Sequence, residues 1–278
     1  MNEPGARRLI HVLIYVLLLL AVLISLFPFY WMFVIGSQTT AAVNQFPPVM
    51  IPGSRFLLNA ENVLERIRFF RGLLNSLVVS GSITLSVLFF SSLAGFAFAK
   101  LKFYGRTFLF VFIVATMMIP MQLGLIPQYM IISHFGWLDS FKAVIVPAMV
   151  SAFGVFWMRQ YIASAIPDEL MEAGRIDGCS NFRLYAGIVL PAIRPALATL
   201  GIVTFMQQWN DFLWPLVVLK DQRVHTIQIM LRLLNDAYYT DYAMVLAGTF
   251  MATLPILIIF LIFSKQFIAG ITEGAVKH

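Results

Sequence analysis

Residues 166–191 read IPDELMEAGRIDGCSNFRLYAGIVLP, and this charge-bearing stretch lies between two strongly apolar blocks. Its first part carries the signals of a helix start. Ser164 can serve as the cap, Pro167 suits a first helical turn, and the two carboxylates that follow favour the positive end of the helix dipole. We therefore expect a short helix from about Pro167 to Asp177.

The second part of the same stretch carries the signals of a turn and of another helix. Gly178 can end the first helix, because glycine takes the left-handed conformation without a side-chain penalty. Ser180 or Asn181 can then cap a second short helix. Residues 164–186 are thus predicted to form a helix-turn-helix elbow that projects from a membrane.

The composition indicates that the rest of the chain lies largely in a membrane. Of the 278 residues, 60% are hydrophobic, 14% are aromatic and only 12% are charged, which is too apolar for a soluble domain of this length. The net charge of +6 is spread along the chain without a basic run for nucleic acid. One cysteine, Cys179, excludes an internal disulfide, and the four histidines lie far apart, so no metal site is predicted.

Six apolar segments are long enough to cross a bilayer, since about 20 helical residues span its hydrocarbon core. The first follows Arg7 and Arg8 but runs too long for a secretory signal, so we expect it to be retained. Together the segments predict an all-α membrane protein with a single transmembrane domain over residues 1–278. The expected spans are residues 9–35, 73–99, 107–132, 141–162, 187–211 and 242–264.

The third segment contains two helix breakers, Pro120 and Pro127. Proline removes a backbone donor, so the freed carbonyls inside a membrane need partners from neighbouring helices or a water-filled cavity. Gln122, Gln128 and Tyr129 stand beside these breaks and are candidates for lining a translocation pathway. Equally, the glutamines could satisfy the kinked backbone.

A second candidate pathway site follows from the end of the fifth segment, where Trp209, Asn210 and Asp211 stand together. Amide and carboxylate groups bind sugar hydroxyls, and aromatic rings cover apolar sugar faces. The simpler interpretation is a polar exit from a spanning helix, because helix ends commonly carry such residues.

The lysines and arginines set a preferred orientation. Eleven of the nineteen fall on the side that holds both termini and the elbow. The remaining eight fall on the other side, four of them in the long loop at residues 37–71, where charge counts for less. We expect cytoplasmic termini and a cytoplasmic elbow.

The elbow resembles the EAA loop of ABC importer permeases, whose pattern reads EAA, three residues, G, nine residues, I, one residue, LP. Gly174 stands where the pattern has its second alanine, and the spacing is otherwise kept. The chain from about Leu9 to Gly274 is also similar to carbohydrate-uptake permeases like the second membrane subunit of the maltose importer, including QQWNDFLWPL at residues 207–216. The matching motif residues are Glu172, Ala173, Gly178, Ile188, Leu190 and Pro191.

The resemblance implies a type I ABC importer permease fold in which the elbow is the coupling helix. Glu172 would pair with a basic residue in a groove of the ATP-binding subunit, and Leu190 and Pro191 would anchor the elbow to the fifth span. A bland alternative is an ordinary loop made helical by its capping residues. The ATPase-docking residues that we expect are Glu172, Ala173, Gly174, Asp177, Gly178, Ile188, Leu190 and Pro191.

The implied partners are a second homologous permease subunit, two ATP-binding subunits, an extracytoplasmic solute-binding protein and a carbohydrate, in a bacterial inner membrane. No GxxxxGK[ST] loop and no catalytic constellation occurs in the sequence, so ATP and Mg²⁺ belong to the partner and no cofactor or catalytic residue is expected here. The predicted function is ATP-driven import of a di- or oligosaccharide. The alternatives are glycerol phosphate or a polyol as substrate, a secondary transporter, and an integral membrane enzyme.

Overall fold

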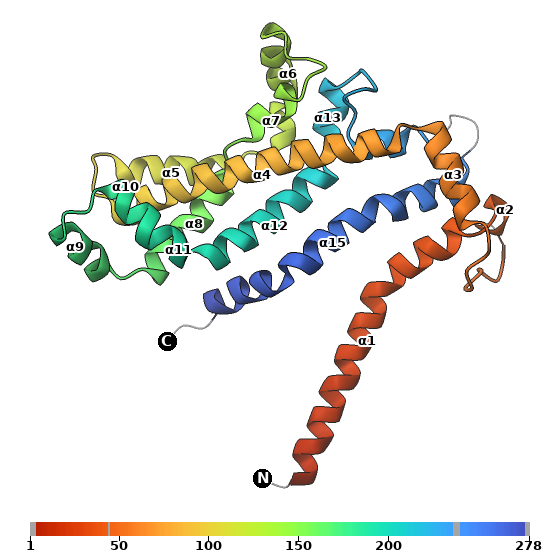
Figure 1. Cartoon of the computed structure of the whole chain (residues 1–278), viewed down its shortest axis with the longest axis horizontal. Coiled ribbons are helices and arrows are strands. Elements are labelled where there is room, and N and C mark those ends of the chain that lie inside the picture. The colour runs from red at the N-terminus through yellow and green to blue at the C-terminus, as the bar shows by residue number, and fades with distance from the viewer. Residues whose placement is uncertain (1–3, 44, 236–239, 276–278) are drawn as a thin grey trace. The chain divides into compact units, whose positions relative to one another are not determined.

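The computed structural model describes residues 4–43, 45–235 and 240–275, and these residues form helices joined by loops (Figure 1). An isolated bridge joins Asn235 and Thr240. The expectation of an all-helical membrane protein is confirmed. Lys277, which contributed to the predicted orientation, lies outside the described residues.

The chain forms two compact units, of which the smaller comprises residues 1–69 and 231–254. Its aromatic centre is a cluster of Phe33, Phe56 and Phe250, whose ring centroids lie 5.0 to 5.7 Å apart. Beside this cluster, the Asn59 amide donates to the carbonyls of Gly36 and Gln38 at 2.8 and 2.9 Å. Its helices are α1 (Pro4–Gly36), α2 (Thr40–Val43), α3 (Phe56–Arg66) and the first part of α15 (Tyr242–Ala275).

The larger unit comprises residues 70–230 and 255–278. It contains α4 (Phe69–Lys100) from its second residue on, the helices that follow it, and the second part of α15. The intervening elements are α5 (Arg106–Thr116), η1 (Met121–Gly124), α6 (Leu125–His134), α7 (Lys142–Ala148), α8 (Ala152–Ala165), α9 (Asp168–Ile176), α10 (Asn181–Leu184), the π-helical turn η2 (Tyr185–Val189), α11 (Leu190–Ala192), α12 (Arg194–Asn210), α13 (Leu213–Val218) and α14 (Ile227–Arg232).

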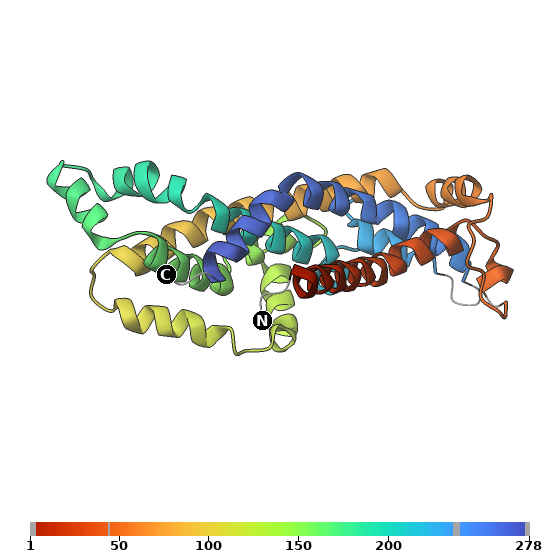
Figure 2. The same ribbon diagram turned by 90° about the horizontal axis from the view of Figure 1, so that it is seen from below.

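The core of the larger unit joins α4, α8 and α12 to the elbow. Ile83, Met158, Leu184 and Ile193 are all fully buried in it, although they come from segments far apart in sequence. The two elbow helices α9 and α10 lie near the C-terminal end of α4 in both views (Figures 1 and 2). The core therefore connects the elbow directly to membrane-spanning helices.

Among the described residues, four helical segments are long and apolar enough to cross a membrane: residues 10–36, 69–100, 142–165 and 242–264. Two further pairs of helices pass the same test together but are sharply bent. The first pair, at residues 106–116 and 121–134, bends by 91°, in agreement with the predicted break of the third segment. The number of crossings is thus four, or up to six if each bent pair is one span, and the division into six spans stays a prediction.

The fifth predicted segment, residues 187–211, is not one straight helix, because the chain bends by 76° between Ala192 and Arg194. Ile193 leaves helical geometry there, with φ −93° and ψ 8°. Pro195 explains the break, since it has no N–H to donate and its ring would clash with the carbonyl four residues earlier in a continuous helix. Pro195 is instead accommodated in the first turn of α12.

Candidate functional site

The first elbow helix, α9, forms at Asp168–Ile176 because its charges match its dipole. Asp168 and Glu169 occupy its first turn and Arg175 its last. The expectation that Ser164 caps this helix is wrong. Ser164 belongs to α8, where its hydroxyl donates to the Tyr161 carbonyl at 3.0 Å. Pro167 is the residue before α9, and proline disfavours helical geometry in the residue that precedes it, which separates α8 from α9.

The turn between the elbow helices is set by Gly178, whose φ is +77°. The Gly178 N–H donates to the Arg175 carbonyl at 3.0 Å, and the Cys179 N–H donates to the Gly174 carbonyl at 2.9 Å. These two bonds form a Schellman motif, which satisfies the last carbonyls of α9. Ser180 then caps α10, accepting from the Arg183 N–H at 3.4 Å. The predicted turn and the predicted Ser180 cap are both present.

The elbow helices pack together through Gly174. A Cβ at this position would overlap the Cδ2 atom of Leu184 and would lie 3.5 Å from Ile188 Cδ1. Leu184 is fully buried, and Met171 on the same face of α9 is buried as well. The replacement of the second motif alanine by glycine therefore has a local reason, since it lets α9 approach α10 and the following turn closely.

The opposite face of α9 is open. Glu172 and Ala173 are exposed, as are Asp177 and Gly178 at the end of the helix. Sequence reasoning missed an apolar part of this surface: the Ile176 side chain is 87% exposed, on the last turn of α9. Phe182 on α10 is exposed too, at 73%. Two large apolar side chains on an otherwise polar hairpin were the available signal, because such residues mark interaction sites when they are grouped.

The remaining motif residues lie on η2 and α11. Ile188 and Leu190 are half-buried against the hydrophobic core, and Pro191 is exposed at the start of the bend before α12. Ile188 also faces Gly174, so the two ends of the motif meet. Within the motif, Glu172, Ala173, Gly178 and Pro191 are thus exposed, whereas Gly174, Ile188 and Leu190 are packed.

Two pairs of polar side chains fix the elbow to α4. The Tyr185 hydroxyl lies 2.7 Å from the Ser92 hydroxyl in a buried pair. Lys100 Nζ contacts Asp168 Oδ1 at 2.6 Å, with the lysine side chain buried and the carboxylate exposed. The hydrogen bond and charge of Lys100 hold the pKa of Asp168 below its ordinary value, with smaller contributions from Lys102 and Arg175. Sequence reasoning missed both pairs, which join residues far apart in the chain.

The candidate pathway residues of the third segment lie on the elements after its bend. Gln122 is exposed on η1, while Gln128 and Tyr129 are half-buried on α6. Tyr129 lines an open hollow of about 470 Å³ together with Leu125, Ile126, Val217 and Lys220. This hollow brings α6 beside the end of α13, so the broken segment meets the region after α12.

The candidate residues at the end of α12 are occupied by local contacts. Trp209 is buried and stacks on Phe205 at a centroid distance of 5.6 Å. The Asn210 amide donates to the Met206 carbonyl at 2.9 Å. The Asp211 N–H donates to the Gln208 carbonyl at 3.4 Å, at the end of α12. These contacts favour the interpretation of a polar helix end over that of a sugar site.

Within the described residues, no group of three or more histidine, cysteine, aspartate or glutamate side chains is placed to hold a metal ion. Cys179 is half-buried in the elbow turn and has a free thiol.

The sequence matches a known protein family and known permease proteins. The family model described as "Binding-protein-dependent transport system inner membrane component" matches residues 87–268. The arabinooligosaccharides transport system permease protein AraQ of Bacillus subtilis (strain 168) is 37% identical over 222 residues, which cover 80% of this chain and 77% of that protein. The sn-glycerol-3-phosphate transport system permease protein UgpE of Escherichia coli (strain K12) is 32% identical over 281 residues, covering 98% of both.

A solved structure shares the fold. A chain in the crystal structure of a bacterial ABC transporter involved in the import of the acidic polysaccharide alginate matches with a TM-score of 0.78 at 24% identity. The match covers 96% of this chain and 99% of that one. Nearly the whole chain thus has a counterpart in that fold.

Proposed function

This chain belongs to the family of binding-protein-dependent transport system inner membrane components, and from that membership we propose that it is the permease of an importer for di- or oligosaccharides. It is a multi-pass protein of the bacterial inner membrane and the permease subunit of an ABC transporter, in which a separate subunit hydrolyses ATP. The carbohydrate class rests on the relative AraQ, whose name gives arabinooligosaccharides. The relative UgpE keeps sn-glycerol 3-phosphate as the alternative.

The proposed assembly contains a second, homologous permease subunit, two ATP-binding subunits and an extracytoplasmic solute-binding protein. In this arrangement both termini and the elbow face the cytoplasm, as the distribution of lysine and arginine favours. Six spans over the residues given above place the two termini on one side. A polar hairpin with its charged face open is consistent with a position outside the hydrocarbon core.

The observation that carries the proposed docking role is the division of the elbow into a packed face and an open face. Met171 and Gly174 hold α9 against the rest of the chain, while Glu172 and Ala173 remain exposed. Glu172 is thereby available to pair with a basic residue on the ATP-binding subunit, and Ile176 adds an apolar contact beside it. Gly178 shapes the turn, and Asp177 adds a second exposed carboxylate at the end of α9.

The proposed mechanism is alternating access. Closure of the two ATP-binding subunits would displace the elbow, and the spans would open the cavity toward the binding protein. Each nucleotide state must favour one arrangement through its own contacts, because a ligand that binds both arrangements equally shifts nothing.

The docking role is tested with Glu172→Lys, which reverses the charge on the open face and changes no packed residue. We expect the ATP-binding subunit to co-purify in a several-fold smaller amount with this variant, since a coupling of 1–3 kcal/mol corresponds to about 5- to 150-fold. Glu61→Lys, an equally exposed glutamate on α3, is the matched control. Equal recovery of the ATP-binding subunit with both variants would remove Glu172 from the interface.

The substrate class is tested by uptake in the host strain with and without this chain. Labelled di- and oligosaccharides are compared with labelled sn-glycerol 3-phosphate at equal concentrations. Loss of saccharide uptake alone supports the proposal. Loss of glycerol phosphate uptake alone replaces it with the alternative.

A further inference from the structure

One face of α4 is reserved for the elbow. Ser92, Phe96 and Lys100 recur every four residues, so they lie above one another along the helix. The Ser92 hydroxyl pairs with Tyr185, and the Phe96 ring lies 5.6 Å from the ring of the same tyrosine. Lys100 binds Asp168, at the other end of the elbow. The elbow is thus attached along about 12 Å of α4, at 1.5 Å per residue.

A neighbouring face of α4 packs tightly on α8. A Cβ added at Gly95 would lie 2.7 Å from Met158 Cβ, and one added at Gly154 would overlap the Ser91 hydroxyl. Small residues at a helix crossing let the two backbones approach closely. Because α8 leads directly into α9, the C-terminal part of α4 is held by the elbow and by the helix that precedes the elbow.

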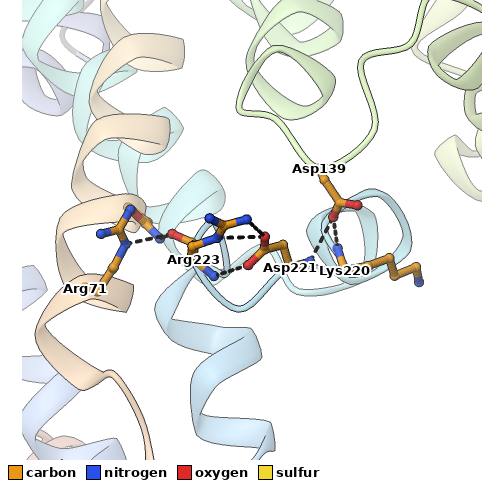
Figure 3. Close-up of polar contacts among 6 residues, drawn as sticks. Arg71, Asp139, Lys220, Asp221 and Arg223 are labelled. Atoms are coloured by element: carbon orange, nitrogen blue, oxygen red, sulfur yellow. Dashed lines mark hydrogen bonds and ion pairs between the residues drawn. The ribbon is translucent and has the colours of Figure 1, made fainter.

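The N-terminal end of α4 is attached to the loop between α13 and α14. Figure 3 shows Arg71 donating to the Arg223 carbonyl, at 2.8 Å. The Asn75 amide donates to the carbonyls of Arg223 and His225 at 3.1 and 2.8 Å, and the Ser76 hydroxyl accepts from the Ile227 N–H at 2.8 Å. Residues 223–227 are therefore bonded to α4 through three side chains of its first two turns.

The same loop is bonded to the segment between α6 and α7. The Asp139 carboxylate accepts from the backbone N–H groups of Lys220 and Asp221, and the Asp221 carboxylate is paired with Arg223 at 2.6 Å (Figure 3). Asp139 itself has a φ of 58°, which is uncommon for a residue other than glycine. The N-terminal end of α4 is therefore linked through residues 220–223 to the segment between α6 and α7.

Between these two ends α4 is continuous. It has 32 residues, about 48 Å at 1.5 Å per residue, and contains no proline. The other described helices of at least 30 residues, α1 and α15, contain Pro28 and Pro255. The covalent route from the elbow into α12 is bent by 76° at Ile193. Kinks and breaks absorb displacement, whereas an unbroken helix bonded at both ends transmits it.

We propose that α4, as a rigid helix, transmits movement of the elbow to the loop at residues 219–227. Ser92, Tyr185 and Lys100 are positioning residues that attach the elbow to the C-terminal part of α4. This inference rests on the proposed docking of an ATP-binding subunit to the elbow. It adds that the docked subunit acts on the far side of the membrane mainly through α4, and only secondarily through α12.

The test uses Tyr185→Phe, Ser92→Ala and the double variant in the full complex, reconstituted in proteoliposomes. The ATP-binding subunit should co-purify and hydrolyse ATP as in the wild type, because the open face of α9 is unchanged. Substrate taken up per ATP hydrolysed should fall about fivefold or more. The double variant should fall no further than either single one, since both remove the same hydroxyl pair.

Two substitutions serve as matched controls. Ser86→Ala lies on α4, where its hydroxyl bonds only the preceding turn of its own helix. Tyr104→Phe lies in the exposed loop after α4. Neither should change uptake per ATP. If Tyr185→Phe and Ser92→Ala behave like these controls, the proposed transmission through α4 is refuted while the docking role stands.

The ion pair gives a second, independent readout should the hydroxyl variants fail to assemble. Lys100→Asp and Asp168→Lys should each lower uptake per ATP, and the two together should restore it at least partly by re-forming the pair in reverse. If the double variant does not restore uptake per ATP, the attachment of the elbow to α4 through the Lys100–Asp168 pair is refuted. If instead no ATP-binding subunit co-purifies with the wild-type chain, the docking role itself fails, which distinguishes the two proposals.

Discussion

The elbow at residues 168–189 and the broken segment at residues 106–134 both interrupt the pattern of spanning helices, but they pack in opposite ways. The elbow is polar in sequence, yet it buries Met171, Leu184 and Tyr185 within the chain. The broken segment is apolar, yet α5 buries no residue, and Met118 and Met121 are 84% and 88% exposed. An apolar surface inside a membrane requires lipid or another subunit. The elbow is therefore built by this chain, whereas the broken segment is completed by its surroundings.

We expect the largest difference between the two regions when the same substitution, glycine to leucine, is made in each of them. Gly174→Leu should loosen the elbow, because even a Cβ there overlaps Leu184, and overpacking typically costs about 1–3 kcal/mol. Gly124→Leu, in the broken segment, meets no atom within 4 Å of its Cβ and should change little. Hydrogen exchange of the amides at residues 168–189 measures the first. Equal protection in both variants would show that Gly174 is not tightly packed.

A somewhat smaller effect is expected at the elbow turn. Gly178 has a positive φ with open space around it, so a substitution there costs backbone strain and no collision. Gly178→Val should destabilise the turn by about 1–2 kcal/mol, whereas Gly178→Asn should cost much less, because asparagine tolerates the left-handed conformation. Exchange at residues 174–184 again provides the measurement. A valine variant as well protected as the asparagine variant contradicts the strain argument.

The broken segment should respond in transport and not in assembly. If Gln122 and Gln128 line the pathway, Gln122→Ala and Gln128→Ala should change the apparent affinity for substrate by about fivefold, corresponding to roughly one hydrogen bond of about 1 kcal/mol. Recovery of the ATP-binding subunit should stay at the wild-type level. If both variants transport normally, the glutamines have the other role considered for them, which is to satisfy the kinked backbone.

The contrast between the elbow and the broken segment also explains which features the sequence alone could predict. The elbow turn and the Ser180 cap depend on residues within one helical turn of one another, so local rules find them. The first cap was expected at Ser164, but Pro167 separates that residue from α9, and the bend at Ile193 was not predicted. The Ser92–Tyr185 pair was invisible, since its partners are 93 positions apart and neither has a distinctive neighbour. The surroundings of the exposed Gln122 lie outside this chain, and no pattern in the sequence describes them.

The smallest effect concerns the charge that ties the elbow to α4. Lys100 lowers the pKa of the Asp168 carboxyl from the ordinary value of 3.8, so this carboxylate contributes to the folded elbow at pH values above 3.8. The contribution is lost as the pH falls through the lowered pKa, and the attachment should be unaffected by pH between 5 and 8. Replacing Lys100 with alanine should raise the pKa of Asp168 toward 3.8, as followed by the carboxyl carbon shift of labelled aspartate in an NMR titration. Lys102→Ala, whose charge contributes less, is the matched control and should raise it by a smaller amount. An equal rise in the two variants would mean that a general positive field, rather than the bond to Lys100, holds Asp168 at the end of α4.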